Sequence, residues 1–310
     1  MNRLPEKLNE YLTLRRGLGF KLRDHESALR KFVVFLQTHD AEFITTRLAL
    51  EWAQQPTLTS TAYRAQRLGK VRAFAQYLSV KDPRMEVPPA DLLSGQPRRA
   101  QPYIYSAAQI LNLVQASALL EPRNRLRPHT YGALFGLLAV TGMRVGEVIS
   151  LKDPDVDLRQ GLITVRKGKF NKTRILPVHD TTRKELCAYV QRRGELAPIR
   201  ATDHFFVSSR GSKLNNSIVH HAFIQISVHI GMRALDDHLG PRIHDLRHTF
   251  AVRTLIDWHR MGIDPEQRLP LLSAYLGHAK VSDTYWYLSA IPELMDAVNT
   301  RLEHFLGDQS

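Results

Sequence analysis

The sequence predicts a mainly α-helical protein of two domains, the second of which also holds a small antiparallel β-sheet. Three observations lead to this fold class. Apolar residues recur at three- and four-residue spacing, the period of an α-helix, through most of the chain. Two short stretches rich in β-branched residues flank a turn that contains glycine and asparagine. Between the two halves lies a segment, 81–102, with five prolines and little periodicity.

The first domain, 1–95, is expected to be helical throughout. Four segments carry an apolar stripe, namely 4–14, 26–36, 46–54 and 61–80. On the last of these, basic side chains lie mostly off the stripe, where they are candidates to run along the phosphates of a partner: Arg64, Arg67, Lys70 and Arg72. The alternative, a basic face that only water covers, is equally consistent with the pattern. Residues 96–102 are predicted to link this domain to the next.

The second domain, 103–310, is expected to begin with a helix capped by Ser106, with Gln109 three residues later completing the cap. Residues 131–140 are apolar on all sides and predict a central helix. Strands are predicted at 162–165 and 174–178, with 204–207 as a candidate third strand. Helical patterns follow at 181–193, 217–230, 246–258 and 292–306, and the segment 275–289 reads as a helix end, a polar turn and a new helix.

The charge of the chain points to a polyanionic partner. The 310 residues carry 43 basic and 30 acidic side chains, a net charge of +13, of which +7 falls in residues 1–100 and +6 in the remainder. Such an excess favours nucleic acid, although a merely basic protein remains an alternative. No uncharged apolar run reaches the length of a membrane span, no signal peptide is visible, and Cys187 is the single cysteine. We therefore expect a protein of the reducing cytoplasm, beside the nucleoid, with no membrane partner.

Four segments hold residues that chemistry could use. They are TGMRVGEVISL (141–151), VRKGKFNKTRILPV (165–178), IHDLRHTFA (243–251) and YLGHAKVSDTYWYLS (275–289). Each is weak alone: an Arg–Glu surface pair, a basic hairpin, a chance His-x-x-Arg match in a chain with 14 histidines, and a packed tyrosine are all common. His220 and His221 lack a partner at the spacing of a zinc site, so no metal centre is expected.

Together and in this order, the four segments resemble the tyrosine recombinase (phage integrase) family over about 103–290. The residues that match the family's catalytic positions are Arg144, Lys169, His244, Arg247, His278 and Tyr287. Tyr287 is chosen over Tyr285 because it stands nine residues after His278. Lys169 is chosen over its rivals Lys167 and Lys172, which are kept as DNA contacts. The segment TYWYLSA is similar to that of recombinases encoded by transposons.

The resemblance implies a metal-independent enzyme, without a cofactor, that breaks and rejoins DNA. Tyr287 would attack the phosphorus and form a 3′-phosphotyrosyl link, while Arg144 and Arg247 hold the non-bridging oxygens. Lys169 would protonate the leaving 5′-oxygen. His244 would serve as the acid or base and His278 would bind the phosphate, with Glu147 orienting its neighbours. The first domain would be the core-binding domain, which closes over DNA opposite the catalytic domain.

Partners and competing functions follow from the same resemblance. The expected substrate is a double-stranded recombination site, bound by a tetramer in which the segment 292–310 docks on a neighbouring copy, with packing on its own domain as the alternative. A second recombinase or an accessory protein is a further candidate partner. An integrase, a transposon recombinase and a chromosome-dimer resolvase all fit. The competing functions are DNA relaxation of the type IB topoisomerase kind and non-catalytic DNA binding on the same fold.

Overall fold

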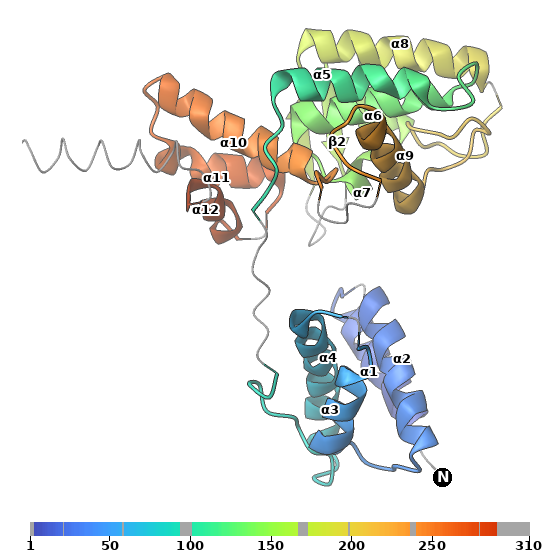
Figure 1. Cartoon of the computed structure of the whole chain (residues 1–310), viewed down its shortest axis with the longest axis vertical. Coiled ribbons are helices and arrows are strands. Elements are labelled where there is room, and N and C mark those ends of the chain that lie inside the picture. The colour runs from blue at the N-terminus through green and yellow to red at the C-terminus, as the bar shows by residue number, and fades with distance from the viewer. Residues whose placement is uncertain are drawn as a thin grey trace, which may run out of the picture. The chain divides into compact units, whose positions relative to one another are not determined.

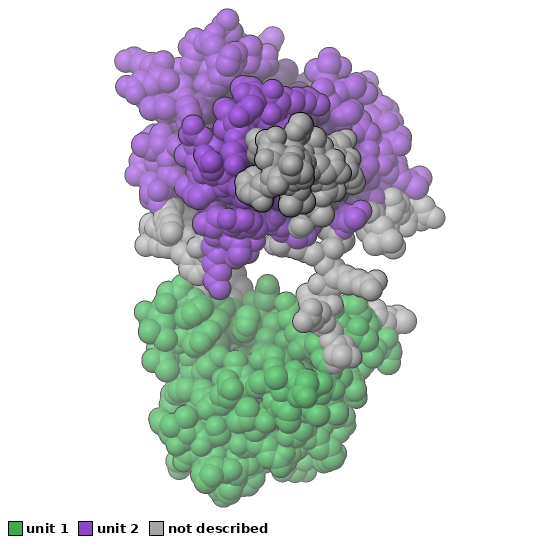
Figure 2. Space-filling view, turned by 90° about the vertical axis from the view of Figure 1, so that its left-hand side faces the viewer, with its two compact units in different colours: residues 1–100 green, residues 101–310 purple. Residues whose placement is uncertain are grey.

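A computed structural model divides the chain into two compact units, residues 1–100 and 101–310 (Figures 1 and 2). It describes residues 3–20, 22–57, 59–93, 101–166, 173–197, 199–235, 240–278 and 280–289. These residues are mostly helical and include a three-stranded antiparallel sheet, which confirms the predicted fold class. Among them no helix is long and apolar enough to cross a membrane. The predicted linker lies largely outside the described residues, so the exact domain boundaries stay a prediction.

The first unit is built from helices at the four predicted places. They are α1 (Leu4–Gly17), α2 (Arg23–Thr38), α3 (Thr46–Gln54) and α4 (Thr61–Ser79). The side chains of Thr45 and Ser60 cap α3 and α4 by accepting a hydrogen bond from a main-chain N–H of the first turn. Phe32, Trp52 and Phe74, from α2, α3 and α4, are buried in one core. The apolar stripes read from the sequence are thus the faces that pack together.

The second unit surrounds α6, which is apolar on all sides as predicted. Its helices are α5 (Ala107–Ala116), α6 (Arg127–Thr141), α7 (Val145–Val148), α8 (Asp180–Leu196), α9 (Asn216–His229), α10 (Asp245–Arg260), α11 (Pro265–Leu276) and α12 (Ser282–Ser289), with short 3-10 turns at Ser117–Leu119 and Asp153–Asp155. α6 packs against α5, α8 and α10. Ser106 and Gln109 form the predicted capping box at the start of α5. The predicted helix at 292–306 lies outside the described residues.

The sheet has the order β1 (Val156–Asp157), β2 (Leu162–Val165) and β3 (Arg174–Pro177), all antiparallel. The prediction of a third strand at 204–207 is wrong. Phe205, Phe206 and Val207 are consecutive buried residues, which resembles a strand in sequence. Their segment makes only two isolated bridges, and the Phe205 N–H donates to the main chain at Leu151. The third strand is instead the two-residue β1, too short to give a sequence signal.

A smaller core joins the last three described helices. Leu255 of α10 and Leu272 and Leu276 of α11 are buried there together with Tyr287 of α12. These helices lie beside one another at one end of the second unit (Figure 1). The helix that carries the predicted nucleophile is therefore held by the helix that carries His244 and Arg247.

Candidate active site

The turn after α6 presents the first candidate residue, Arg144. Gly142 ends the helix in the left-handed conformation, at φ +60°, and a Cβ there would lie 2.6 Å from the Phe250 ring. Glycine is thus required both by the backbone conformation and by the close approach of α10. The chain reverses at this point, and Arg144 stands at the N-cap of α7 with an extended backbone.

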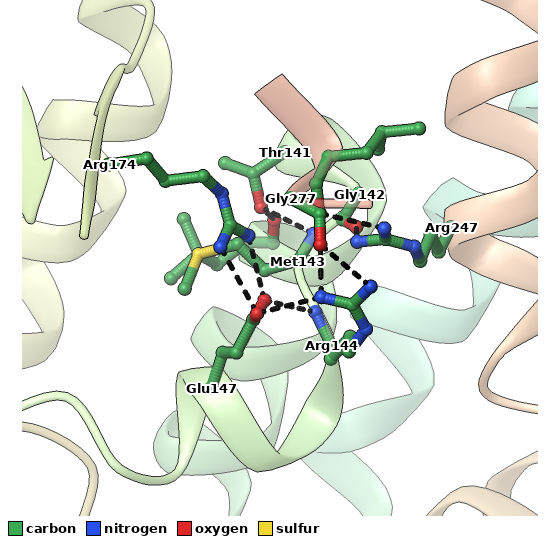
Figure 3. A network of polar contacts seen from close by, with 10 residues as sticks. Thr141, Gly142, Met143, Arg144, Glu147, Arg174, Arg247 and Gly277 are labelled. Atoms are coloured by element: carbon green, nitrogen blue, oxygen red, sulfur yellow. Dashed lines mark hydrogen bonds and ion pairs between the residues drawn. The ribbon is translucent and has the colours of Figure 1, made fainter. Parts of the chain in front are cut away.

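Glu147, one turn along, fixes Arg144 in place. It accepts hydrogen bonds from the Arg144 main-chain N–H and from Nη1, each at 3.0 Å. The other end of the guanidinium donates from Nη2 to the carbonyl oxygen of Gly277, 3.1 Å away (Figure 3). Residues 133 positions apart in the sequence are joined in this way.

A second guanidinium on Glu147 comes from Arg174, at the start of β3, which the sequence did not single out. Its Nη1 and Nη2 donate to the two carboxylate oxygens at 3.1 and 2.8 Å (Figure 3). Burial by itself would raise the pKa of Glu147, but the bonds from Arg174 and Arg144 outweigh it and lower the pKa. Glu147 therefore stays ionised and holds both arginines.

Arg247 approaches the same turn from α10. The residue is only 2% exposed, and its guanidinium donates to the carbonyls of Gly142 and Leu276, both at 2.7 Å. Burial and the nearby charge of Arg144 lower its pKa to about 10, so it remains protonated at neutral pH. Arg144 and Arg247 thus both contact the C-terminal end of α11, where free carbonyl oxygens favour cations.

His278 and Tyr287 lie on either side of the turn between α11 and α12. His278 Nδ1 is 2.7 Å from the hydroxyl oxygen of Thr284, a buried residue on α12. The His278 and Tyr287 rings are nearly parallel, with centroids 6.4 Å apart. Tyr287 is 2% exposed and Tyr285 is 50% exposed, so the two candidates for the nucleophile point to different surroundings. Tyr287, with its ring beside that of His278, is the better placed of the two.

Two histidines, His244 at the N-cap of α10 and His248 in its first turn, lead from the predicted acid or base to the predicted nucleophile. The His244 and His248 rings meet edge to face, with centroids 4.8 Å apart. Desolvation of the ring and the charge of Arg247 lower the pKa of His244, although the residue as a whole is exposed. His248 Nδ1 lies 3.0 Å from the Tyr287 hydroxyl. Sequence reasoning missed His248; its signal was its position four residues after His244, on the same helix face.

The basic turn between β2 and β3 falls outside the described residues. Lys167, Lys169 and Lys172 all lie there, so the choice of Lys169 as the catalytic lysine stays a prediction. The strands on either side are described, and β3 brings Arg174 to the site.

The basic residues of α4 have partners within their own unit. Arg64 donates to the carbonyls of Pro56 and Thr57, and Arg72 to those of Pro88 and Pro89. Arg67 donates to the Trp52 carbonyl, and its guanidinium stands 3.7 Å from the centroid of the Trp52 ring. Three of the four predicted DNA contacts therefore also take part in packing of the first unit.

Comparisons with known proteins place the chain in a family. The sequence model of the phage integrase family matches residues 106–293. The protein Putative integrase/recombinase y4rB of Sinorhizobium fredii is 45% identical over the full length of both chains. The tyrosine recombinase XerD of Vibrio cholerae is 30% identical over 78% of this chain and 74% of its own length.

The fold is similar to that of a solved integrase. The structure of the Tn1549 transposon integrase in complex with transposon right end DNA matches with a TM-score of 0.68 and 14% identity, covering 96% of this chain and 98% of that one. The family match includes the elements that carry Arg144, Arg247 and Tyr287. The chain belongs to the phage integrase family of tyrosine recombinases.

Proposed function

We propose that this chain is a site-specific recombinase that cleaves and rejoins DNA through a 3′-phosphotyrosyl intermediate on Tyr287. The observation that carries the proposal is the convergence of Arg144 and Arg247 on the turn between α11 and α12, the helix of Tyr287. The relatives named above are integrases and recombinases, which favours recombination over the relaxation of supercoiled DNA.

The arginines supply the positive charge that this reaction needs. A tyrosine hydroxyl has an ordinary pKa of ~10 and is a poor nucleophile at neutral pH. Its oxygen attacks the phosphorus as the bond from phosphorus to the 5′-oxygen breaks. Two guanidiniums on the non-bridging oxygens stabilise the charge that develops in between. The new ester keeps the energy of the broken bond, so a 5′-hydroxyl can reverse the reaction without a nucleotide.

Proton transfers complete the proposal. Lys169 gives a proton to the departing 5′-oxygen, which would otherwise leave as an alkoxide. His244 takes part as an acid or base: it takes the proton that the Tyr287 hydroxyl gives up, and its lowered pKa leaves the free ring neutral at pH 7. His278, held by Thr284, donates to the phosphate. Glu147 orients Arg144 and does not react.

The partner is DNA, and the finer assembly is part of the proposal. Four copies pair two recombination sites in the cytoplasm, beside the nucleoid, and residues 292–310 of each copy dock on a neighbour. On α4 of the first unit, Lys70 contributes a phosphate contact, whereas Arg64, Arg67 and Arg72 donate to carbonyls of their own unit and serve mainly in its packing. The net charge of +13, divided between both parts of the chain, supports a clamp on both sides of a duplex.

A DNA duplex nicked near the cleavage position tests the proposal, because the short fragment leaves and traps the covalent intermediate. Wild type should form a protein–DNA adduct, Tyr285→Phe should form it as well, and Tyr287→Phe should not. Arg144→Ala should slow adduct formation by on the order of 10²–10³ with little loss of DNA affinity. Absence of an adduct with wild type, or an undiminished adduct with Tyr287→Phe, would contradict the assignment.

A further inference from the structure

The Tyr287 hydroxyl has a polar neighbour that the expected set of catalytic residues does not contain. His248 Nδ1 lies 3.0 Å from the Tyr287 oxygen, within the ordinary length of a hydrogen bond. The two residues stand 39 positions apart, on α10 and α12. Packing of these helices in a shared core fixes the distance between them.

The surroundings of His248 keep its ring neutral. Burial is the main cause that lowers its pKa to about 4, and the charges of Arg242 and Arg247 act in the same direction, as does His244. Asp245 acts in the opposite direction. A neutral imidazole has one nitrogen without a proton, which can accept a hydrogen bond. The phenol of Tyr287 has one proton to donate.

Aromatic contacts leave the His248 ring little freedom to turn. Its centroid lies 5.5 Å from both the Trp286 and the Tyr287 rings and 4.8 Å from the His244 ring. The acceptor nitrogen is therefore presented to Tyr287 in a fixed direction. Arg247, the residue before His248, extends instead to the turn that also holds Arg144. Of these two consecutive residues of α10, His248 thus faces the nucleophile and Arg247 faces the predicted phosphate site.

We propose that His248 is a positioning residue for the nucleophile: by accepting a hydrogen bond from the Tyr287 hydroxyl through Nδ1, it aims the phenol oxygen at the phosphate. This inference rests on the function proposed above. Without the acceptor, rotation about the Cα–Cβ bond of Tyr287 is restrained less, and the phenol oxygen spends less time aligned for attack. Misplacement of a reacting group by about 1 Å can cost on the order of 100-fold in rate.

Three variants at position 248 separate this role from simple packing. In His248→Asn, an amide oxygen stands near the place of Nδ1, so adduct formation on the nicked duplex should stay within about threefold of wild type. In His248→Gln the amide reaches the place of Nε2, and in His248→Phe the ring has no acceptor. Both should slow adduct formation by about 10- to 100-fold while DNA affinity stays unchanged. His259→Asn, on the far end of α10, should react as wild type does.

The outcomes distinguish the inference from the function on which it rests. If wild type forms no adduct, the proposed function fails. If wild type reacts and His248→Phe reacts equally fast, the positioning role is wrong. Equal losses in His248→Asn and His248→Phe would also contradict it, because only asparagine keeps an acceptor near the place of Nδ1. Thermal unfolding of each variant identifies any that fail to fold, and the comparison of Asn with Gln then decides, since both introduce the same amide.

Discussion

At the scale of single residues, the guanidiniums of the site already have partners in the free protein. Arg144 and Arg247 donate to main-chain carbonyls of Gly142, Leu276 and Gly277. These oxygens are neutral, and a phosphate oxygen is a stronger acceptor for a charged donor. A DNA phosphate can therefore replace them while the arginines remain directed to the same turn. The carbonyls act as substitutes that keep the buried charges hydrogen-bonded until DNA arrives.

Arg174 should prove important for both stability and cleavage, although it has no assigned role. Its partner Glu147 is a carboxylate with a side chain that is 9% exposed, and Arg174 itself is 12% exposed. Arg174→Ala removes half of the hydrogen bonds that keep this buried charge satisfied, and should lower the free energy of unfolding by about 2–3 kcal/mol. The change should also slow adduct formation, because Glu147, no longer held by Arg174, would hold the Arg144 guanidinium less rigidly.

Arg84→Ala is the matched control for Arg174→Ala. Arg84 pairs with Asp82 and lies over the Phe43 ring, but its side chain is 67% exposed, so its removal should cost less than that of Arg174. Denaturant unfolding of the two variants measures the difference. A loss in Arg174→Ala no larger than that in Arg84→Ala would show that the buried network does not contribute as described.

Acid should destabilise the second unit through His248. The folded pKa of about 4 lies below the ordinary value of 6.5, so the unfolded chain takes up a proton first as the pH falls. The contribution is fully present above pH 6.5 and is lost between about pH 6.5 and 4. Between pH 7 and 5 it amounts to about 2 kcal/mol of unfolding free energy. His248→Asn should show a correspondingly shallower decline in denaturant titrations; an unchanged decline would contradict the burial of a neutral ring.

At the scale of elements, the end of α11 is the point where the site is assembled. Gly277 adopts φ +69°, and a Cβ there would stand 2.7 Å from the Arg174 guanidinium. Its carbonyl accepts a bond from Arg144, and the next residue is His278. The end of α11 therefore contacts Arg144, lies against Arg174 and leads into His278. It does so by a conformation that residues with a side chain rarely adopt.

Gly277→Ala should consequently damage fold and function together. The left-handed conformation costs about 1–2 kcal/mol in a residue with a Cβ, and Arg174 must also move. Gly194→Ala is the control: nothing lies within 4 Å of the added Cβ, the residue is inside α8, and alanine should raise stability by about 0.5–1 kcal/mol. Thermal and denaturant unfolding of both variants tests this. Equal changes in stability in the two variants would contradict the claim that the left-handed conformation at Gly277 requires glycine.

The sequence predicted the elements much better than the contacts between them. Periodicity located the helices of the first unit to within a few residues, because their stripes are the faces that pack. It located the end of α11 but not the rest of that helix, whose pattern is interrupted by Pro270, and it did not identify the short β1. Arg174 and His248 were missed for another reason. Their partners Glu147 and Tyr287 lie 27 and 39 positions away, and only the fold brings such groups together.

At the scale of the whole molecule, the positive charge has two uses. Part of it is neutralised locally or committed to packing, as with Arg67 over the Trp52 ring and Arg72 on two carbonyls. The rest remains available to a polyanion. A count of basic residues therefore overstates the number of phosphate contacts, and the salt dependence of binding should reveal the smaller number.

Two variants of α4 separate these uses of charge. Lys70→Ala should reduce the slope of log affinity against log salt by about 1, with little change in stability. Arg67→Ala should instead lower the unfolding free energy of the first unit by about 1–2 kcal/mol, because it loses the stacking on Trp52 and a hydrogen bond. Duplex binding at several salt concentrations and denaturant unfolding provide both readings. If Lys70→Ala lowered stability and Arg67→Ala did not, the assignment of Lys70 to phosphate binding and of Arg67 to packing would be wrong.

The place of Tyr287 in the core of α10, α11 and α12 has a mechanical consequence. In the proposed intermediate a long polymer is tied to this side chain. Any tension on the duplex then passes into packed atoms of two neighbouring helices and is shared among them. A tyrosine on a loose terminal arm would bear such a force alone. The nucleophile is thus also the anchor point, seated where the protein can resist a pull.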